Sequence, residues 1–493
     1  MTIPHDVYDN PLIGRYASRE MAQRWSPLRK FRTWRRLWLA LAEAQAELGL
    51  MGDNGQPRIT PAQLEELRAH LDDIDLERAA EHEKRLRHDV MAHIATLKEV
   101  APGCGDILHL GATSCYVTDN TDLILIRESL QHLCESLACV IDALAQFADQ
   151  WKNEPTLGFT HFQPAQLTTV GKRASLWLYD FVRDLHELER RRDELPFRGA
   201  KGTTGSQASF LALFHGDSEK VKQLDQLVAR KNHFTRVVPV CGQTYPRKID
   251  AEVLDALSGV AQSAHKMGTD LRLLAHRQEI DEPFEAEQVG SSAMAYKRNP
   301  MRSERMCSIA RFVMGLPAMA ATTAATQWLE RTLDDSAGRR LYIPQAFLGT
   351  DAVLRIALNL LTQPSGGEQR GLIVNQTVVA RSVREYLPYI ATENLMMAAV
   401  QAGEDRQVVH DVVRKHSHAV TAQVKAGQGS PTELFDRLRQ EPVFRNVDFA
   451  AVLDPRQFIG RCPQQVEEFL EEYVAPIRKR YQNVLGQVAE LPV

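Results

Sequence analysis

The amino-acid sequence predicts an all-α protein, with three helical domains and a long central helix bundle. Three stripes of apolar residues at helical spacing carry this prediction, and segments with the alternating pattern of β-strands are scarce. The chain has 493 residues, of which 44% are hydrophobic and 25% charged, as in globular proteins with a sizeable core. At about 150 residues per domain, this length indicates about three domains.

The first apolar stripe is the longest, with residues that recur at alternating steps of three and four. It consists of Leu123, Ile126, Leu130, Leu133, Leu137, Val140, Leu144 and Phe147. Asp119, Asn120 and Thr121 precede it, and their side-chain oxygens can accept the free N–H groups of a first helical turn. We therefore expect this helix to begin there. Similar stripes run through residues 167–188 and 253–274, and three such helices predict a bundle.

Apolar residues also lie beside the first stripe, including Ile124, Cys134 and Ile141. More than one face of this helix is therefore expected to be buried. Long bundles commonly gain such contacts by self-association, so we expect a homo-oligomer.

Two breaks in composition indicate domain boundaries. The segments APGCGDILHLG (101–111) and PSGGEQRG (364–371) are rich in glycine and interrupt the helical pattern. We place an N-terminal domain at residues 1–113, the central bundle at 114–364 and a C-terminal helical domain at 365–493. Residues 236–240 are a candidate short strand. Residues 309–328 form the most apolar stretch. Because Arg311 and Pro317 interrupt it, we interpret it as a buried helix and not as a membrane span.

Charge and cysteine content exclude several classes of protein. Lys and Arg total 59 against 63 Asp and Glu, so the net charge of −4 offers no general attraction to nucleic acid or membrane surfaces. Seven cysteines without paired spacing favour a reducing compartment. Residues 1–10 lack the apolar core of a signal peptide. We expect a cytoplasmic protein that binds neither nucleic acid nor membrane.

The common cofactor motifs are missing from the sequence. It has neither a phosphate-binding G-x-x-x-x-G-K-[ST] loop nor G-x-G-x-x-G after a strand. His88 and His93 are five residues apart, which does not match the H-E-x-x-H zinc motif. We expect no metal and no cofactor.

Three segments contain residue types that suit catalysis. In GSSAMAYKRNP (290–300), Ser291 offers a hydroxyl and Lys297 a positive charge, although such compositions usually form solvated turns. His161 precedes the stripe that starts at residue 167, so we expect it at a helix entry, as a general acid or base or as a capping residue. The segment RLRHDVMAH (85–93) could bind an anion, or could be a solvated helix face.

Taken together, these motifs resemble the fumarase/aspartase superfamily. GSSAMAYKRNP resembles its signature loop, G-S-S-x-M-P-x-K-x-N-P, and GATS (111–114) and THFQPAQ (160–166) occur in the expected order. RHDVMAH (87–93) and GQTY (242–245) are similar to the adenylosuccinate lyase family within it. The resemblance covers nearly the whole chain.

The resemblance implies a homotetramer of three-domain, all-helical subunits, with active sites assembled from three subunits. It also implies a lyase of purine nucleotide biosynthesis that works without a cofactor on small purine nucleotide substrates. Fumarate is released by β-elimination from adenylosuccinate, giving AMP, and from succinylaminoimidazole carboxamide ribotide, giving AICAR.

The resemblance also assigns catalytic roles. Ser291 would be the general base and His161 the general acid, and His88 would assist proton transfer. Lys297 would stabilise the negative charge that develops when a proton leaves the carbon next to a carboxylate. One departure is Ala295, which stands where the signature has proline. Because proline restricts the open loop only modestly, we expect altered loop dynamics rather than lost activity.

The substrate-binding residues are likewise implied by the resemblance. The expected phosphate and ribose contacts are Arg15, Tyr16, Arg331, Ser336 and Arg340. The expected contacts to the succinyl carboxylates and the base are Arg87, His88, Asp89, Thr113, Ser114, Gln243 and Arg305. Arginine side chains suit a phosphate because their planar forks match its oxygens.

Two alternatives stay open. The first is another lyase of the superfamily, such as argininosuccinate lyase or fumarase, against which RHDVMAH and the arginine set argue. The second is a non-enzymatic helical scaffold of the kind found among lens crystallins, against which the presence of Ser291, Lys297 and His161 argues.

Overall fold

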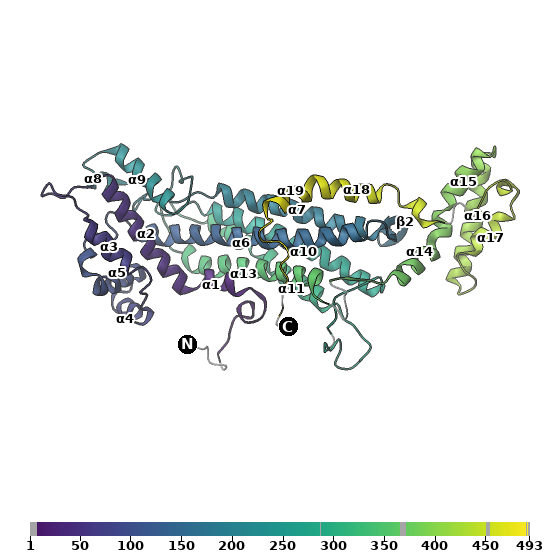
Figure 1. The fold of residues 1–493 in the computed structure, drawn as a ribbon, viewed down its shortest axis with the longest axis horizontal. Coiled ribbons are helices and arrows are strands. Elements are labelled where there is room, and N and C mark those ends of the chain that lie inside the picture. The colour runs from purple at the N-terminus through teal and green to yellow at the C-terminus, as the bar shows by residue number, and fades with distance from the viewer. Residues whose placement is uncertain (1–6, 286, 365–370, 450–453, 490, 492–493) are drawn as a thin grey trace.

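The computed structural model describes residues 7–285, 287–364, 371–449, 454–489 and 491. The molecule is elongated, with long helices along its length and smaller groups of helices at its two ends (Figure 1). The described strands are short and form two-stranded sheets, so the all-α prediction is confirmed.

The centre of the molecule is a bundle of long helices. They are α6 (Ser114–Gln150), α7 (Val170–Glu194), α10 (Lys248–His276), α11 (Met301–Gly315) and α13 (Asp335–Thr362). The three predicted stripes lie on α6, α7 and α10, apart from Leu167, and their residues form one buried core. At 1.5 Å per residue, the 37 residues of α6 extend about 55 Å.

The start of α6 differs from the prediction. The helix begins at Ser114, so Asp119, Asn120 and Thr121 lie inside it and are buried. Asp119 accepts hydrogen bonds from Arg247, and the Asn120 amide bonds to the backbone of Gly199. These polar side chains do not cap a helix start because they connect α6 to neighbouring segments.

One end of the bundle carries the helices that lie to the left in Figure 1. They are α2 (Pro27–Glu47), α3 (Pro61–Ala69), α4 (Leu76–Leu86), α5 (Asp89–Val100), α8 (Ala208–Leu213) and α9 (Ser218–Lys231), with the short turn η2 (Pro102–Cys104). The segments before α2, η1 (Leu12–Tyr16) and α1 (Arg19–Arg24), lie against α13. Ser26 caps α2, whose Trp34 and Trp38 are fully buried against the bundle. The predicted break at residues 101–111 is confirmed as η2 and the turns that follow it.

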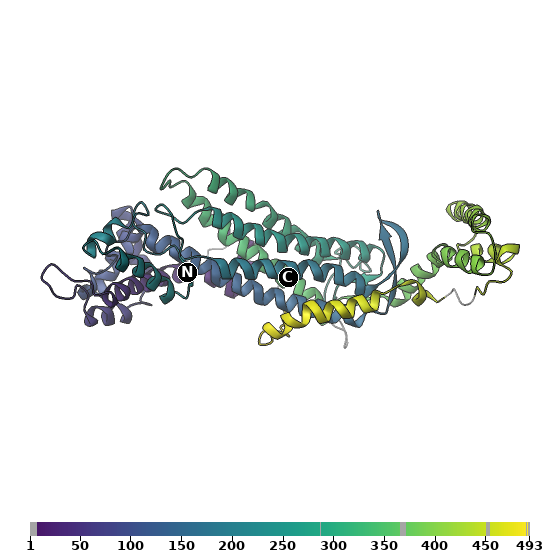
Figure 2. The same cartoon turned by 90° about the horizontal axis from the view of Figure 1, so that it is seen from above.

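The other end carries a small helical group with its own apolar core. It consists of α14 (Gln376–Ile390), α15 (Thr392–Gln401), α16 (Arg406–Lys425), α17 (Glu433–Arg439) and η3 (Pro442–Phe444). The chain then returns along the bundle through η5 (Pro455–Phe458), α18 (Cys462–Phe469), η6 (Leu470–Val474) and α19 (Ala475–Arg480), as Figure 2 shows. The break expected at 364–371 lies mostly outside the described residues.

The apolar stretch 309–328 is not the single buried helix that we predicted. It contains the end of α11 and a separate helix, α12 (Pro317–Ala325), which begins at a proline that cannot continue α11. By length and composition Met301–Ala325 could cross a membrane, but a soluble core helix passes the same test. Only 33% of its most apolar window is buried, and Phe312 and Met319 are exposed.

The described strands form two small antiparallel pairs. β1 (Pro155–Thr160) and β2 (Gln163–Thr169) form a hairpin, and β3 (Ile280–Asp281) pairs with β4 (Ile373–Val374). The candidate strand at 236–240 is reduced to one bridge between Val237 and Phe197. Pro239 has no N–H group to extend the pairing.

Candidate active site

A cavity of about 690 Å³ lies where the starts of α2, α5, α6 and α13 meet, and we call it the His88 cavity. Eight of the predicted site residues line it: His88, Asp89, Thr113, Ser114, Gln243, Arg331, Ser336 and Arg340. These residues come from four separate stretches of the chain. The fold therefore gathers most of the predicted substrate contacts in one place.

His88 is fixed at the sharp corner between α4 and α5. Arg87 ends α4 in the left-handed conformation, with φ of 55°, and His88 caps α5. The Nδ1 atom of His88 accepts the N–H of Met91 at 3.4 Å, and Nε2 lies 3.2 Å from the Ser114 hydroxyl. The ring therefore turns Nδ1 toward the start of α5 and Nε2 toward Ser114.

Asp89 and Arg340 face each other across the cavity mouth. An Asp89 oxygen lies 3.6 Å from the Arg340 guanidinium, whose side chain is 62% exposed. Asp89 stands in the first turn of α5, where the helix dipole stabilises a carboxylate. Arg340 therefore keeps donors available for an anion that enters the cavity.

Gln243 is held in place from three sides. Its side-chain amide donates to the Thr113 hydroxyl at 3.3 Å, and its backbone N–H donates to the carbonyl of Glu330 at 2.9 Å. Its own carbonyl accepts from buried Arg198 at 2.8 Å. The preceding Gly242 permits this approach, since a Cβ there would lie 2.4 Å from the Glu330 carbonyl oxygen.

A buried chain of ion pairs forms part of the cavity wall. Arg247 contacts Asp119 of α6 at 3.1 Å and Asp335 of α13 at 2.7 Å, and Asp335 also accepts from Arg331 at 2.7 Å. Burial alone would raise the pKa of Asp119, but Arg247 holds this pKa below its usual value. Asp335 contacts both Arg247 and Arg331, and so orients Arg331 at the cavity wall.

A second buried cluster lies beside the first. Arg339 donates to Asp250 at 2.7 Å, to Asp122 at 2.8 Å and to the Tyr245 hydroxyl. Burial raises the pKa of Asp122, although Arg339 opposes this shift. Together the two clusters tie α6, α10 and α13 to one another beneath the cavity.

Lys30 of α2 also lines the cavity, and sequence analysis missed it. Its ammonium group lies 5.2 Å from the ring centre of Phe31 and 5.0 Å from that of Trp34. Burial lowers its pKa, although Asp122 partly offsets this effect. In the sequence, Lys30 is one lysine within the aromatic-rich start of an amphipathic helix. This pattern indicates a helix that faces the core more often than a ligand-binding site.

Three further predicted contacts form a separate group, and Arg87 also lies outside the cavity lining. The ring centre of Tyr16 is 6.0 Å from the guanidinium of Arg15 and 6.0 Å from that of Arg305. These residues belong to η1 and α11, and none of them lines the His88 cavity.

His161 does not stand at a helix entry, contrary to our expectation. Thr160 pairs with Gln163, so His161 and Phe162 form the two-residue turn of the β1–β2 hairpin, with φ of 53° and 55°. Leu167 belongs to β2 and packs with Leu157 in a small core, which explains why the helical stripe seemed to start too early. His161 is therefore presented at an exposed tip.

The signature loop is exposed and closed at its base. Glu282 accepts the backbone N–H groups of Arg302 and Ser303, which begin α11, at 2.9 and 2.6 Å. Within the loop, the Asn299 amide donates to the carbonyl of Gly290 at 3.0 Å. The loop projects from the side of the bundle (Figure 1).

The two predicted catalytic residues of this loop differ in their contacts. The Ser291 hydroxyl oxygen accepts the N–H groups of Ala293 and Met294 at 3.4 and 3.2 Å. Lys297 is exposed. Neither residue lines the His88 cavity.

The predicted catalytic groups are far apart within one chain. Ser114 begins α6, whereas the hairpin that carries His161 follows the other end of this helix, about 55 Å away. Figure 1 shows α5 and β2 at opposite ends of the bundle. One chain therefore brings most of the predicted binding residues together, but not His161.

Comparisons with known proteins match almost the whole chain. The family model described as "Lyase" matches residues 17–315, and "Adenylosuccinate lyase C-terminus" matches residues 388–469. Adenylosuccinate lyase from Saccharomyces cerevisiae is 48% identical over 98% of both chains, and the protein of that name from Schizosaccharomyces pombe is 48% identical over 97% of both.

Solved structures agree on the fold. A fumarate lyase from Mesorhizobium sp. BNC1 has a TM-score of 0.75 at 23% identity, covering 94% of this chain and 100% of the other. A 3-carboxy-cis,cis-muconate lactonizing enzyme from Pseudomonas putida has a TM-score of 0.78 at 21% identity, covering 96% and 100%.

Proposed function

The chain belongs to the adenylosuccinate lyase family, and we propose that it cleaves adenylosuccinate to AMP and fumarate. We propose the same β-elimination, without a cofactor, for succinylaminoimidazole carboxamide ribotide, which gives AICAR in purine nucleotide biosynthesis. The observation that carries this proposal is the His88 cavity, which gathers eight of the contacts expected for such a substrate.

The cavity has the charges that this substrate requires. Adenylosuccinate carries a phosphate and two carboxylates, and Lys30, Arg331 and Arg340 supply cationic groups to the cavity. Asp335 fixes Arg331, so little reorganisation is needed when a phosphate binds. The His88 imidazole and the Ser114 hydroxyl are hydrogen-bonding groups beside them.

The elimination itself needs two proton transfers. A base removes the proton from the carbon next to a succinyl carboxylate, the C–N bond breaks, and an acid protonates the departing nitrogen. We assign Ser291 as the base, Lys297 as the charge that stabilises the aci-carboxylate, and His161 as the acid. The backbone N–H groups of Ala293 and Met294 donate to the Ser291 hydroxyl oxygen and hold it in place.

We propose that other subunits complete the site, within a homotetramer. The distance of about 55 Å along α6 supports this, because His161 of one chain cannot reach the His88 cavity of the same chain. Exposed apolar residues support it as well, including Phe312, Met319 and Trp328, which is 71% exposed. A second copy could cover such a surface.

We also propose that the protein is cytoplasmic and binds neither nucleic acid nor membrane. All seven cysteines are free thiols, which suits a reducing compartment. The near-balanced charge supports the same conclusion.

Incubation of the purified protein with adenylosuccinate, and separately with argininosuccinate, tests the proposal. Chromatography detects the products. We expect AMP and fumarate from adenylosuccinate and no reaction with argininosuccinate. Fumarate from argininosuccinate would assign the chain to the sister activity, and no product from either would support a scaffold. The Ser291→Ala variant is the control for a contaminating lyase.

A further inference from the structure

A second cavity, of about 820 Å³, lies on the other side of α2, and we call it the α2–α6 cavity. Residues Arg29, Thr33, Arg36, Ala40 and Glu43 of α2 line it, whereas Pro27, Lys30 and Phe31 line the His88 cavity. Its other walls come from α1, α6, the end of α7 and the end of α9. None of the residues assigned above to substrate binding or catalysis lines it.

The lining of this cavity is rich in cationic side chains. Six of them, Arg24, Arg29, Arg36, Arg127, Arg192 and Lys231, stand against the four carboxylates Glu43, Glu128, Glu135 and Asp193. The carboxylates already have partners. Both oxygens of Glu128 accept from Arg29, at 2.6 and 2.8 Å, and Asp193 accepts from Arg192 at 2.7 Å.

The remaining two carboxylates are also engaged. Glu43 pairs with Lys231 at 3.2 Å and with Arg68 at 2.6 Å. Glu135 accepts from the amide of Gln131 at 2.7 Å. Glu135 therefore has a neutral partner, and the lining as a whole, with six cations against four carboxylates, keeps an excess of two positive charges.

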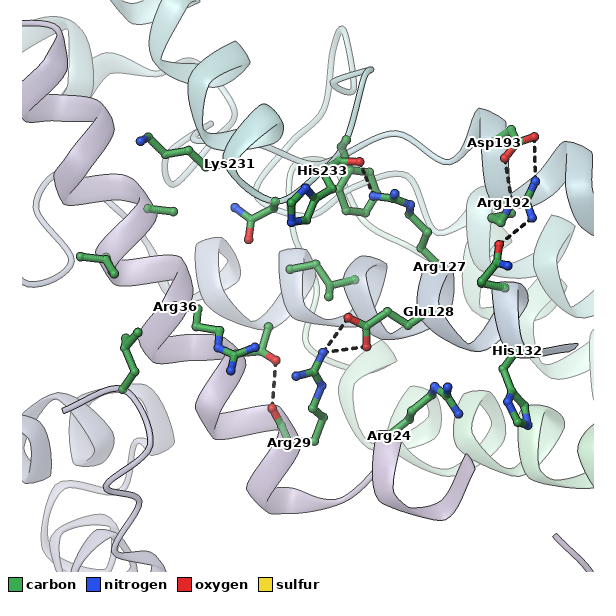
Figure 3. A pocket seen from close by; sticks show the side chains of 18 of the residues that line it. Arg24, Arg29, Arg36, Arg127, Glu128, His132, Arg192, Asp193, Lys231 and His233 are labelled. Carbon is green, nitrogen blue, oxygen red and sulfur yellow. Dashed lines mark hydrogen bonds and ion pairs between the residues drawn. The ribbon is translucent and has the colours of Figure 1, made fainter. Parts of the chain in front are cut away.

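Three arginines of the cavity, Arg24, Arg36 and Arg127, donate no hydrogen bond to a carboxylate of the described residues. The Nη1 atom of Arg24 is buried without a hydrogen-bond partner among the described residues. Arg127 donates to the backbone carbonyl of His233, and Arg36 is 4.0 Å from its nearest paired carboxylate, Asp72. Figure 3 shows Arg24, Arg36 and Arg127 around the cavity, with Arg24 beside His132.

The electrostatics of Arg127 agree with this arrangement. Burial lowers its pKa and the nearby charge of Arg192 lowers it further, although Glu128 and Asp193 oppose this shift. An anion placed between these two arginines would relieve their repulsion.

The spacing of the cations sets the size of the anion. The lining cations come from α1, α2, α6, α7 and α9, and they surround a volume of about 820 Å³, which is much larger than one phosphate. We propose that the α2–α6 cavity binds an extended polyphosphate, such as the triphosphate group of a nucleotide, with Arg24, Arg36 and Arg127 as its main contacts. Guanidinium forks suit phosphate oxygens, and the volume suits a ligand of this size.

Isothermal titration of the whole enzyme with inorganic triphosphate tests this proposal. We expect saturable binding that weakens as salt is added, because the contacts are ionic. The Arg24→Gln/Arg36→Gln double variant should bind at least tenfold more weakly, and Arg36→Gln alone is the substitute if the double variant does not assemble. Arg19→Gln, an exposed residue of the same helix as Arg24, is the matched control and should bind as the wild type does.

A second variant separates this cavity from the His88 cavity. Arg331→Gln should weaken binding of adenylosuccinate and leave the affinity for triphosphate unchanged. ATP that binds more tightly than triphosphate would identify a nucleotide ligand, and equal affinities would identify the phosphate chain as the part that is recognised. No binding by the wild type, equal affinity in the double variant, or loss of triphosphate binding in Arg331→Gln would each overturn the proposal.

Discussion

The His88 cavity and the two exposed segments, the hairpin turn and the signature loop, are built in opposite ways. The cavity rests on buried ion pairs among α6, α10 and α13, where Asp119, Arg247 and Asp335 are almost completely buried. His161 and Ser291 instead stand on turns that their own strands or loop backbone hold. The comparison shows that one chain gathers most of the predicted binding residues in a cavity with a buried frame, whereas His161 and Ser291 lie outside that cavity.

The largest expected effect on activity comes from a substitution in the exposed signature loop. Ser291→Ala should lower kcat by about 10²–10⁴-fold or more, because it removes the proposed base. Adenylosuccinate binding, measured by titration, should be retained, since Ser291 does not line the cavity. Residual turnover near the wild-type level would remove Ser291 from the mechanism.

Mixing two inactive variants tests whether different chains contribute Ser291 and His161 to one site. Ser291→Ala and His161→Asn chains should each be inactive, yet a mixture that is unfolded and reassembled should regain activity, because some sites then receive both intact residues. The same treatment of each variant alone is the control. A mixture as inactive as its components would place both residues in one chain's site.

Asp335→Asn tests the buried ion pairs in the wall of the His88 cavity. It leaves Arg247 and Arg331 without this carboxylate, so we expect a loss of about 3–5 kcal/mol in the free energy of unfolding and a raised KM. Denaturant unfolding and steady-state kinetics measure these effects. The neighbouring Asp334→Asn, at an exposed position, is the matched control and should change little.

Lys30 gives a smaller effect with a defined pH dependence. Lys30→Met should raise KM about tenfold, the usual consequence of losing one charge-assisted hydrogen bond. Because burial lowers the Lys30 pKa, its positive charge disappears at a lower pH than that of an exposed lysine, so KM should rise with pH earlier in the alkaline range. Lys30→Arg should move this rise to higher pH, and an unchanged profile would exclude Lys30 from substrate binding.

The smallest effect is expected at Ala295. The N–H of Lys297 donates to the carbonyl of Met294, which makes Ala295 the second residue of a β-turn, a position that favours proline. Ala295→Pro should therefore be tolerated and should stiffen the open loop by about 0.4–1 kcal/mol. A change in kcat of a few fold at most should result. A collapse of activity would show that the loop needs another backbone conformation at this residue.

Sequence reasoning predicted the features that depend on local pattern. The stripes located α6, α7 and α10 because burial of one helix face repeats every three to four residues. It failed where a residue's role depends on a distant partner: Asp119 resembles a helix cap until Arg247 is brought beside it. His161 was assigned to the wrong kind of element. Leu167 fits the apolar spacing of the following helix, but in the structure it belongs to the strand β2.

The candidate site was predictable to a similar extent. Residues carried by motifs, such as His88 and Ser114, were found and do meet in the cavity. Lys30 has no motif around it, and only the packing of α2 against the bundle brings it to the His88 cavity. The apolar stripe predicted that α6 is long, but only the fold shows that the cavity and the hairpin with His161 lie at its two opposite ends.

The length of α6 has a kinetic consequence. If a complete site needs more than one chain, a newly made chain is folded but inert, and activity depends on protein concentration more steeply than first order. Specific activity should then fall on dilution below the dissociation constant of the assembly, with a lag on reconcentration, while the helical signal of each chain stays constant. Assembly, rather than folding, would switch this enzyme on.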